Sequence, residues 1–523
     1  MAFENHNNIP IRLFPSPRLT KAKSIPLSIL DATCARFADT SAIWLYDPPS
    51  GYQVNDEFIN KLKTTFVTTL NNFPQWAGQV HWAPFRPGGH HTERFNRSMI
   101  TYGSDADPGV EWHVVRHENS IISHIPHGEY LSSCTIWSGD AFPQKELISK
   151  SRTPLSNLKD FEGMPGLMVQ INLFPCGRYG VGVKLAHQLA DASSMMVFVH
   201  QWAANSRKLF SGQPSSSVFD EPVFDPPQLD SRAAGDIDGE VVHHELADTA
   251  RMMPLNRFSW WDTEEPGYSP RLVNTTENSI PPAQVLAKTK VSPSTIAPWK
   301  TWDLARPVEY GLLHFTGHEL TKLQREARES APEGAIISRT DALMAYIFRL
   351  VTRARAYAQS DDDEVFLNTS IDVRRRVSPP LPETFLGSPL LVTHIKGLAS
   401  AVRCASLGEL ALKLRETLMR FTPDKVAAIL HDAAYETSPQ RLWLCFVGTL
   451  HIIATSWQRL RVYDVDFDGT GHRPAYVHSV MEKIDGTVVV LDPITQDGGV
   501  DVALYLDAEA MGHLKEALEI TND

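Results

Sequence analysis

Two alternating runs joined by a short turn, followed at once by a helical pattern, constrain this chain more than any other stretch. Apolar and polar residues alternate over Met168–Phe174 and again over Val181–Leu185, as in a half-buried hairpin. After Asp191 the apolar residues recur at helical spacing, and aspartate is a favourable residue at which to begin a helix. The pattern therefore predicts strand, turn, strand and helix, with His187 held between the second strand and the helix.

The spacing of His187 and Asp191 is weak evidence for chemistry when it is taken alone. A second His-x-x-x-Asp occurs at His244 and Asp248, in a region with no clear strand before it. On spacing alone, the favoured interpretation of His187 is a core histidine that is satisfied by the backbone. The strand before it and the helix after it shift the balance towards a functional histidine.

The length of the chain and its change in composition indicate two domains. A chain of 523 residues exceeds one ordinary core. Proline and serine cluster over 213–227, and prolines recur over 266–298, between two halves that both mix strand and helix patterns. We expect an N-terminal domain over residues 1–210, a crossover over 211–305 and a C-terminal domain over 306–523.

Charge and cysteine content exclude several classes of protein. The net charge of −12, with no basic stripe, argues against a nucleic-acid partner, so an anionic ligand needs a local cluster of cations. Five scattered cysteines form no CxxC pair and predict neither a zinc ribbon nor a disulfide framework. The apolar stretch Leu442–Trp457 is too short and too polar to span a bilayer, and it is interpreted as buried strand. No signal-peptide pattern opens the sequence, so we expect a cytoplasmic protein.

Two histidine pairs have the i, i+4 spacing of metal ligands. His113 and His117 lie in an apparent strand, whereas His314 and His318 lie on either side of a strand end. Neither pair presents both imidazoles on one helical face, so we expect no metal site.

Several short motifs follow one another along almost the whole chain. They are Leu27–Asp31 (LSxxD), Phe73–Gly78, His187–Asp191 (HxxxD), Ser338–Leu343, Asp372–Arg376 with Pro379–Pro382, and Thr455–Trp457 with Asp466–Phe467. In this order they resemble the BAHD acyltransferases, a coenzyme A (CoA)-dependent family related in fold to chloramphenicol acetyltransferase.

The resemblance implies both a fold and an activity. The fold would be α/β: two chloramphenicol-acetyltransferase-like domains with mixed sheets, joined by the crossover, with an active-site tunnel between them. The activity would be transfer of an acyl group, expected to be acetyl, from acyl-CoA to a hydroxyl of a specialised metabolite, with an amine as the less favoured acceptor. His187 would be the general base, because a neutral imidazole accepts a proton near neutral pH. CoA would be a co-substrate, no cofactor would be bound permanently, and the chain would act as a monomer.

The resemblance also implies roles for other residues. Asp191 would point away from the tunnel and pair with an arginine, which shapes the loop that holds His187. Asp466 would be a second structural aspartate, with Arg374 as its expected partner. CoA contacts would come from five residues: Ser338, Arg339, Arg376, Ser456 and Trp457.

Three segments depart from the family pattern. Ala192 replaces the usual glycine, Asp466–Gly471 replaces DFGWG with a longer loop that lacks tryptophan, and Phe385–Ser388 replaces YFGN. These changes are more similar to the fungal branch of the family than to the plant branch. They also motivate an alternative function, a non-acylating member of the fold that binds or cyclises a small molecule.

A hydrolase that uses a serine nucleophile is the weakest alternative. Ser193 and Ser194 follow Asp191 at the start of the predicted helix, where serine is common for structural reasons. We therefore expect no Ser-His-Asp triad.

Overall fold

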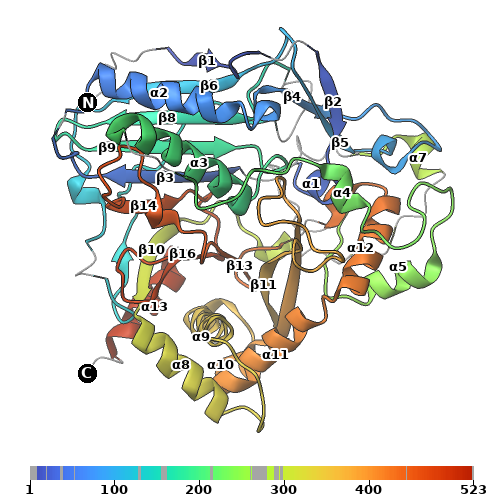
Figure 1. Ribbon diagram of the computed structural model, residues 1–523. Coiled ribbons are helices and arrows are strands. Elements are labelled where there is room, and N and C mark those ends of the chain that lie inside the picture. The colour runs from blue at the N-terminus through green and yellow to red at the C-terminus, as the bar shows by residue number, and fades with distance from the viewer. Residues whose placement is uncertain are drawn as a thin grey trace.

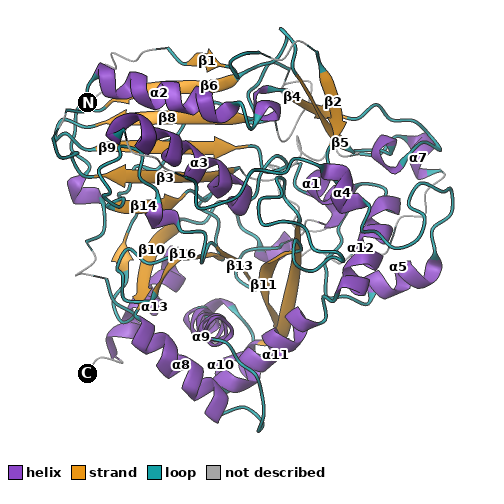
Figure 2. Cartoon of the chain, in the orientation of Figure 1, coloured by secondary structure: helices purple, strands orange, loops and turns teal. Residues whose placement is uncertain are grey.

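The computed structural model shows a mixed α/β protein built on two large sheets and a small third one (Figures 1 and 2). It describes all residues except 1–8, 19–20, 36–38, 52, 128–130, 155–161, 213–215, 260, 262–279, 288–291, 293, 295–298, 443–444 and 521–523. The predicted α/β class with mixed sheets is confirmed.

The first sheet contains the predicted hairpin at its centre. Its order is β1 (Ile11–Leu13), β6 (Val110–Arg116), β8 (Leu167–Leu173), β9 (Tyr179–Leu185), β3 (Thr40–Tyr46) and β14 (Tyr476–Ser479). β8 and β9 are antiparallel, with Leu167 opposite Leu185. Helices α2 (Asp56–Leu70) and α3 (Ala192–Ser211) lie side by side against this sheet (Figure 1). Trp44, Phe66 and Trp202 are fully buried there and form the centre of this core.

The second sheet carries the other large core. Its order is β12 (Leu390–Leu398), β11 (Glu364–Asp372), β13 (His451–Ser456), β15 (Thr487–Leu491), β16 (Val500–Asp507), β10 (Val308–Phe315) and β7 (Trp137–Ser138). The pairs β11–β13 and β13–β15 are parallel, and the others are antiparallel. The helices that pack on it are α8 (Gly317–Glu329), α9 (Arg339–Ala354), α10 (Ala399–Cys404), α11 (Leu407–Met419) and α13 (Ala508–Ile520).

Each large sheet takes one strand from the other half of the chain. β14 pairs with β3 in the first sheet, with Tyr476 opposite Leu45. In return, β7 pairs with β10 in the second sheet, with Trp137 opposite Leu312. The two halves of the chain thus exchange one strand each. The domain boundaries near residues 210 and 306 stay a prediction.

A third group of elements lies at the right of Figure 1. A small sheet has the order β2 (Lys23–Pro26), β5 (Ser98–Tyr102) and β4 (Gln79–Trp82). The nearby helices are α1 (Ile29–Thr33), α4 (Pro226–Asp230), α5 (His244–Arg251), α7 (Ala283–Leu286) and α12 (Pro423–Tyr435). Short 3₁₀ helices cover Pro74–Ala77, His91–Glu93, Ile122–His124, Trp299–Thr301, Ala356–Ala358, Pro439–Leu442 and Val462–Asp464. Most of the proline-rich stretch 266–298 lies outside the described residues.

Local signals in the sequence account for many element boundaries. Asp191 caps α3 by accepting a hydrogen bond from the backbone N–H of Ser194. The Thr316 hydroxyl and the Glu319 carboxylate form a capping box at the start of α8. Gly78 is required by close packing, because a Cβ atom there would lie 2.5 Å from the carbonyl oxygen of Thr101.

The prediction of one buried strand over Leu442–Trp457 is wrong. Pro439–Leu442 is a 3₁₀ helix, and the strand begins only at His451. Gly448, with φ of 97°, makes the turn before β13, so the apolar stretch includes a bend. No helix among the described residues is long and apolar enough to cross a membrane.

Candidate active site

His187 lies in the tight turn that joins β9 to α3, as the sequence pattern predicts. The backbone N–H of Ala186 donates to Gly166, and the N–H of Leu189 donates back to Ala186. These two bonds fix the backbone on either side of His187. The imidazole is partly buried, and burial lowers the pKa of His187 below its ordinary value, opposed by its hydrogen bond to its own backbone carbonyl. A lowered pKa keeps the ring neutral near pH 7.

Ser388 sets which ring nitrogen of His187 carries the proton. Its hydroxyl donates to the backbone carbonyl of His187, and its Oγ also lies 3.1 Å from His187 Nδ1. Since the single hydroxyl hydrogen goes to the carbonyl, Oγ acts as acceptor towards Nδ1–H. The neutral ring then carries its basic lone pair on Nε2.

Asp191 is held by an arginine, and that arginine is Arg374. Arg374 Nη1 lies 2.7 Å from Asp191 Oδ2 and Nη2 lies 3.0 Å from Oδ1, a two-pronged ion pair. Both side chains are at least 96 % buried. Burial is the largest single effect on the pKa of Arg374, and it lowers this pKa. The carboxylates of Asp191 and Asp372 together outweigh burial and raise the pKa of Arg374 above its ordinary value. The charge on this guanidinium is therefore permanent.

The same arginine orders the loop that carries Ser388. Its Nε and Nη2 donate to the carbonyl of Phe385, and the carbonyl of Gly387 accepts from the backbone N–H of Asp191. The hydroxyl of Ser194 bonds to the backbone of Gly387 and to Arg374. The Ser194 hydroxyl is thus occupied by hydrogen bonds to this loop and to Arg374, which disfavours Ser194 as a nucleophile beside His187.

Asp31 supports Ser388 from the opposite side. Its Oδ1 accepts the backbone N–H of Ser388 at 2.5 Å, and its Oδ2 accepts the N–H and the hydroxyl of Ser28. Burial raises the pKa of Asp31 to about 7, against the lowering effect of these donors. The LSxxD motif therefore places a carboxyl group two contacts away from His187.

Asp466 does not pair with Arg374, and that prediction is wrong. Its Oδ1 accepts from the backbone N–H groups of Asp468 and Gly469, and its Oδ2 accepts from Gly471. Burial and the neighbouring Asp468 raise the pKa of Asp466. The longer loop that replaces DFGWG therefore folds around its own aspartate, while Arg374 is taken by Asp191.

The residues expected to contact CoA lie in two groups around the start of α9. Ser338 caps α9 by accepting the N–H of Asp341, and Arg339 beside it is exposed. Thr340 and Ser456 both contact the side-chain oxygen of Gln458, at 3.2 and 3.5 Å. This shared contact brings Ser456 to the start of α9.

Arg376 and Trp457 occupy different surroundings. The Trp457 side chain is 3 % exposed and belongs to the first core, so it does not present its ring to solvent. Arg376 donates to the carbonyls of Leu418 and Phe421, and burial together with the nearby Arg415 lowers the pKa of Arg376. Arg415 also reaches Asp341, at 3.8 Å. Two guanidinium groups thus lie close together near the first turn of α9.

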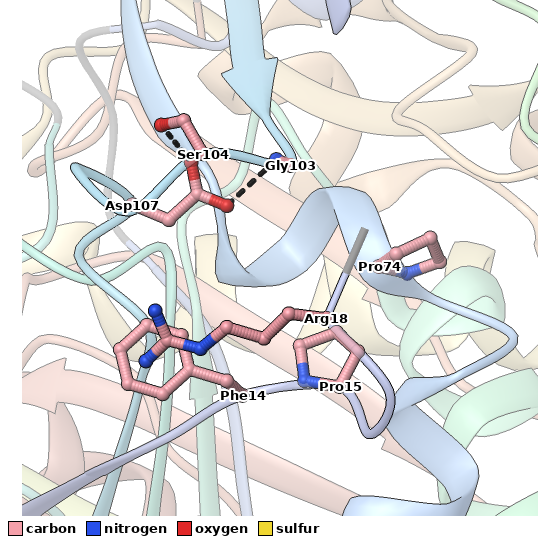
Figure 3. Close-up of a pocket in the computed structure, with 7 residues that line it drawn as sticks. All are labelled: Phe14, Pro15, Arg18, Pro74, Gly103, Ser104 and Asp107. Carbon is pink, nitrogen blue, oxygen red and sulfur yellow. Dashed lines mark hydrogen bonds between the residues drawn. The ribbon is translucent and has the colours of Figure 1, made fainter. Parts of the chain in front are cut away.

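A surface hollow lies apart from these residues (Figure 3). It is lined by Phe14, Pro15, Arg18, Pro74, Gly103, Ser104 and Asp107. Asp107 accepts from the N–H of Gly103 and the hydroxyl of Ser104, and the Arg18 guanidinium lies over the Phe14 ring. Arg18 also pairs with Asp105 at 3.5 Å, and the lining includes none of the predicted site residues.

The sequence carried only a partial signal for Ser388 and Asp31. Both belong to quoted motifs, but nothing local shows that they meet, because 357 positions separate them. The departure from YFGN at Phe385–Ser388 is the one signal that marked this loop.

Comparisons with known proteins identify relatives over almost the whole chain. The Transferase family model matches residues 146–521. The chain is 27 % identical to Acyltransferase AFT15-1 of Alternaria alternata over 516 residues, covering 95 % of this chain and 94 % of that protein. It is 22 % identical to Acyltransferase abl6 of Leptosphaeria maculans, covering 92 % and 89 % of the two chains.

Solved structures show the same fold across the whole chain. The TM-score with vinorine synthase is 0.63 at 17 % identity, covering 98 % of both chains. With F. sporotrichioides TRI101, solved with coenzyme A and T-2, it is 0.64 at 16 % identity, covering 96 % and 98 %. The family model alone spans more than half of the sequence. The chain therefore belongs to the Transferase family, the BAHD-type coenzyme A-dependent acyltransferases.

Proposed function

We propose that this protein transfers an acyl group from acyl-CoA to a hydroxyl group of a small-molecule metabolite, with His187 as the general base. The supporting observation is the fixed state of the ring: Nδ1–H faces Ser388, and burial lowers the pKa of His187. A neutral imidazole with its lone pair on Nε2 can remove the acceptor's proton as the oxygen attacks the thioester.

The reaction then follows ordinary acyl transfer. The acceptor oxygen adds to the thioester carbonyl while its proton passes to Nε2 of His187. The tetrahedral intermediate collapses, the C–S bond breaks, and the protonated imidazole returns the proton to the departing CoA sulfur. The products are an ester and CoA thiol, so no external oxidant or second nucleophile is needed.

Cationic groups near the start of α9 support an acyl-CoA co-substrate. Arg376 lies near Arg415, and Arg339 is exposed at the first position of the helix. The phosphate groups of CoA need such a local concentration of positive charge on a chain whose net charge is −12. Solved TRI101 structures contain coenzyme A or ethyl coenzyme A.

The finer parts of the proposal extend the same reasoning. We propose acetyl as the acyl group, a specialised metabolite as the acceptor and a hydroxyl in preference to an amine. We also propose a monomer acting in a reducing cytoplasm, in a tunnel between the two large sheets. The structure places none of the five cysteines, all of them among the described residues, in a disulfide, which is compatible with a reducing compartment.

The decisive experiment follows thiol release and product mass with acetyl-CoA and a panel of polycyclic alcohols and matched amines. We expect an acetylated alcohol with the wild type, and at least ~10²-fold slower turnover with His187→Ala. His318→Ala, an exposed histidine on α8, is the matched control and should keep full activity. Equal turnover by wild type and His187→Ala would exclude the mechanism. Tight acceptor binding without thiol release would favour the non-acylating alternative.

A further inference from the structure

Two adjacent histidines and one aspartate of the crossover bring three metal-binding atoms together. His90 and His91 stand at the start of a short 3₁₀ helix, and Asp238 lies between α4 and α5. The ligand atoms of the three residues all lie within 4.8 Å of one another. Asp238 lies 147 positions from His91, so the cluster joins two distant segments.

Two of the three separations are near that of ligands which share one ion, and the third is within 4.8 Å. Asp238 Oδ1 lies 2.8 Å from His91 Nδ1, and Oδ2 lies 3.3 Å from His90 Nε2. Two atoms bound to one tetrahedral Zn²⁺ at about 2.0 Å each lie about 3.3 Å apart. Small side-chain movements would therefore complete the site.

The second nitrogen of each imidazole is held by an orienting group. His91 Nε2 lies 3.1 Å from Asp230 Oδ2, and the other oxygen of Asp230 accepts the backbone N–H of Ile29. A buried carboxylate behind a histidine is the usual support of a metal-binding imidazole. His90 Nδ1 lies 2.9 Å from the hydroxyl oxygen of Thr92 and accepts the backbone N–H of Thr92 at 3.4 Å, so Thr92 holds this ring in place.

The carboxylate of Asp238 is also fixed in place. Its Oδ1 accepts the backbone N–H of His91 at 2.9 Å, and its own N–H donates to Asp236 Oδ1. Hydrogen bonds therefore hold both imidazoles and the carboxylate in place.

We propose that His90, His91 and Asp238 bind one Zn²⁺ ion, which ties the crossover to the N-terminal domain. Two imidazoles and a carboxylate suit Zn²⁺, and water would take the fourth position. Ions can reach the site from solvent, since the side chains of His90 and Asp238 are 49 % and 44 % exposed while His91 is 7 % exposed. This site is independent of acyl transfer, and it lies outside the i, i+4 histidine pairs from which we expected no metal site.

The test uses the full chain stripped of metal by a chelator and titrated with Zn²⁺ against a competing chromophoric chelator. We expect one tight equivalent per chain, lost in His90→Ala and in Asp238→Asn. Asp230→Asn should keep the site but weaken it by ~10–100-fold, as removal of an orienting carboxylate does. His318→Ala and His244→Ala, exposed histidines elsewhere, should bind as the wild type does.

Two further readouts separate this site from scattered surface binding. Co²⁺ in place of Zn²⁺ should give the intense visible bands of a four-coordinate ion in the wild type and lose them in His90→Ala. Saturating Zn²⁺ should raise the Tm of the wild type but not of Asp238→Asn, because a ligand stabilises only the state that binds it. Equal Zn²⁺ affinity in wild type and His90→Ala, or a Co²⁺ spectrum unchanged by that substitution, would overturn the proposal.

Discussion

Arg374 binds both carboxylate oxygens of Asp191, at 2.7 and 3.0 Å, although 183 positions of sequence separate the two residues. The same guanidinium holds the carbonyl of Phe385, three residues before Ser388. The pair therefore joins the turn that carries His187 to the loop that orients its ring.

The first prediction concerns the stability of this pair. Arg374→Ala leaves the charge of Asp191 buried without its partner, so unfolding free energy should fall by ~3–5 kcal/mol. Asp191→Asn keeps the helix cap but leaves the buried charge of Arg374 without its partner, so it should also lower the free energy of unfolding. A double-mutant cycle, measured by denaturant unfolding, should show strong coupling between the two. Simple additivity would mean that the two groups do not interact.

Asp466 gives the contrasting case. Its carboxylate is bound by backbone N–H groups of its own loop and shares no partner with Arg374. Asp466→Ala should lower Tm by loosening that loop, and its effect should add to that of Arg374→Ala within ~0.5 kcal/mol. Coupling between Asp466 and Arg374 would restore the pairing predicted from the motif.

The second prediction concerns Ser388 as a positioning residue. Ser388→Ala removes the acceptor that faces Nδ1–H of His187, and one net hydrogen bond of ~0.5–1.5 kcal/mol corresponds to a ~2–12-fold loss in kcat. KM for acyl-CoA should stay unchanged, because Ser388 contacts the base and not the proposed phosphate-binding arginines. Ser193→Ala, on the first turn of α3, is the matched control and should be nearly silent. An unchanged kcat in Ser388→Ala would show that the His187 carbonyl orients the ring without help.

Local signals in the sequence predicted the strands and helices around the site, but not which side chains pair with one another. The β8–β9 hairpin, the start of α3 at Asp191 and the capping box of α8 all depend on residues a few positions apart, so periodicity and capping rules suffice. The partner of Asp191 depends on where distant loops meet in space. Several carboxylates compete for Arg374, and motif order alone does not show which one lies closest.

Burial is the other quantity that the pattern could not supply. Trp457 belongs to the Thr455–Trp457 motif yet packs into the first core. Asp31 is a buried acid whose carboxylate is in contact with Ser388 and Gly387, far along the chain. The His90–His91–Asp238 cluster went unpredicted for a different reason, since its third member comes from the crossover, 147 positions from His91.

The third prediction uses the raised pKa of Asp31. The folded pKa is about 7 against an ordinary 3.8, so the folded state keeps this proton between about pH 4 and 7 while the unfolded state loses it. Stability from this group is therefore full below pH 4 and falls as pH rises to 7. Asp31→Asn cannot ionise, and its unfolding free energy should fall less steeply than that of the wild type across this window. Denaturant unfolding at several pH values measures both slopes, and parallel slopes would contradict the assignment.

The fourth prediction concerns the pH dependence of turnover. The base must be neutral to act, and burial lowers the pKa of His187 below its ordinary value of 6.5. kcat/KM should therefore rise with pH through a pKa below 6.5 and stay level above it. The residual activity of His187→Ala should lack this acidic limb. A limb with a pKa well above 6.5 would mean that the protonated ring is stabilised in the free enzyme, or that another group controls the reaction.

The last prediction separates CoA binding from chemistry. Arg339 is exposed at the start of α9, and Arg415 lies near Arg376 and 3.8 Å from Asp341. If these groups hold CoA phosphates, loss of one charged hydrogen bond of ~1.5–3 kcal/mol in Arg339→Ala or Arg415→Ala should raise KM for acyl-CoA by ~10–100-fold.

In both variants kcat at saturation should stay near the wild-type value, because neither side chain takes part in proton transfer. Arg325→Ala is the control, since Arg325 is an exposed arginine on α8 that faces Glu329 at 4.0 Å. Raising the salt concentration should weaken CoA binding by the wild type more than by either variant, because screening acts on the charge that each variant lacks. An unchanged KM in both variants would place the phosphates elsewhere on the surface while leaving the role of His187 untouched.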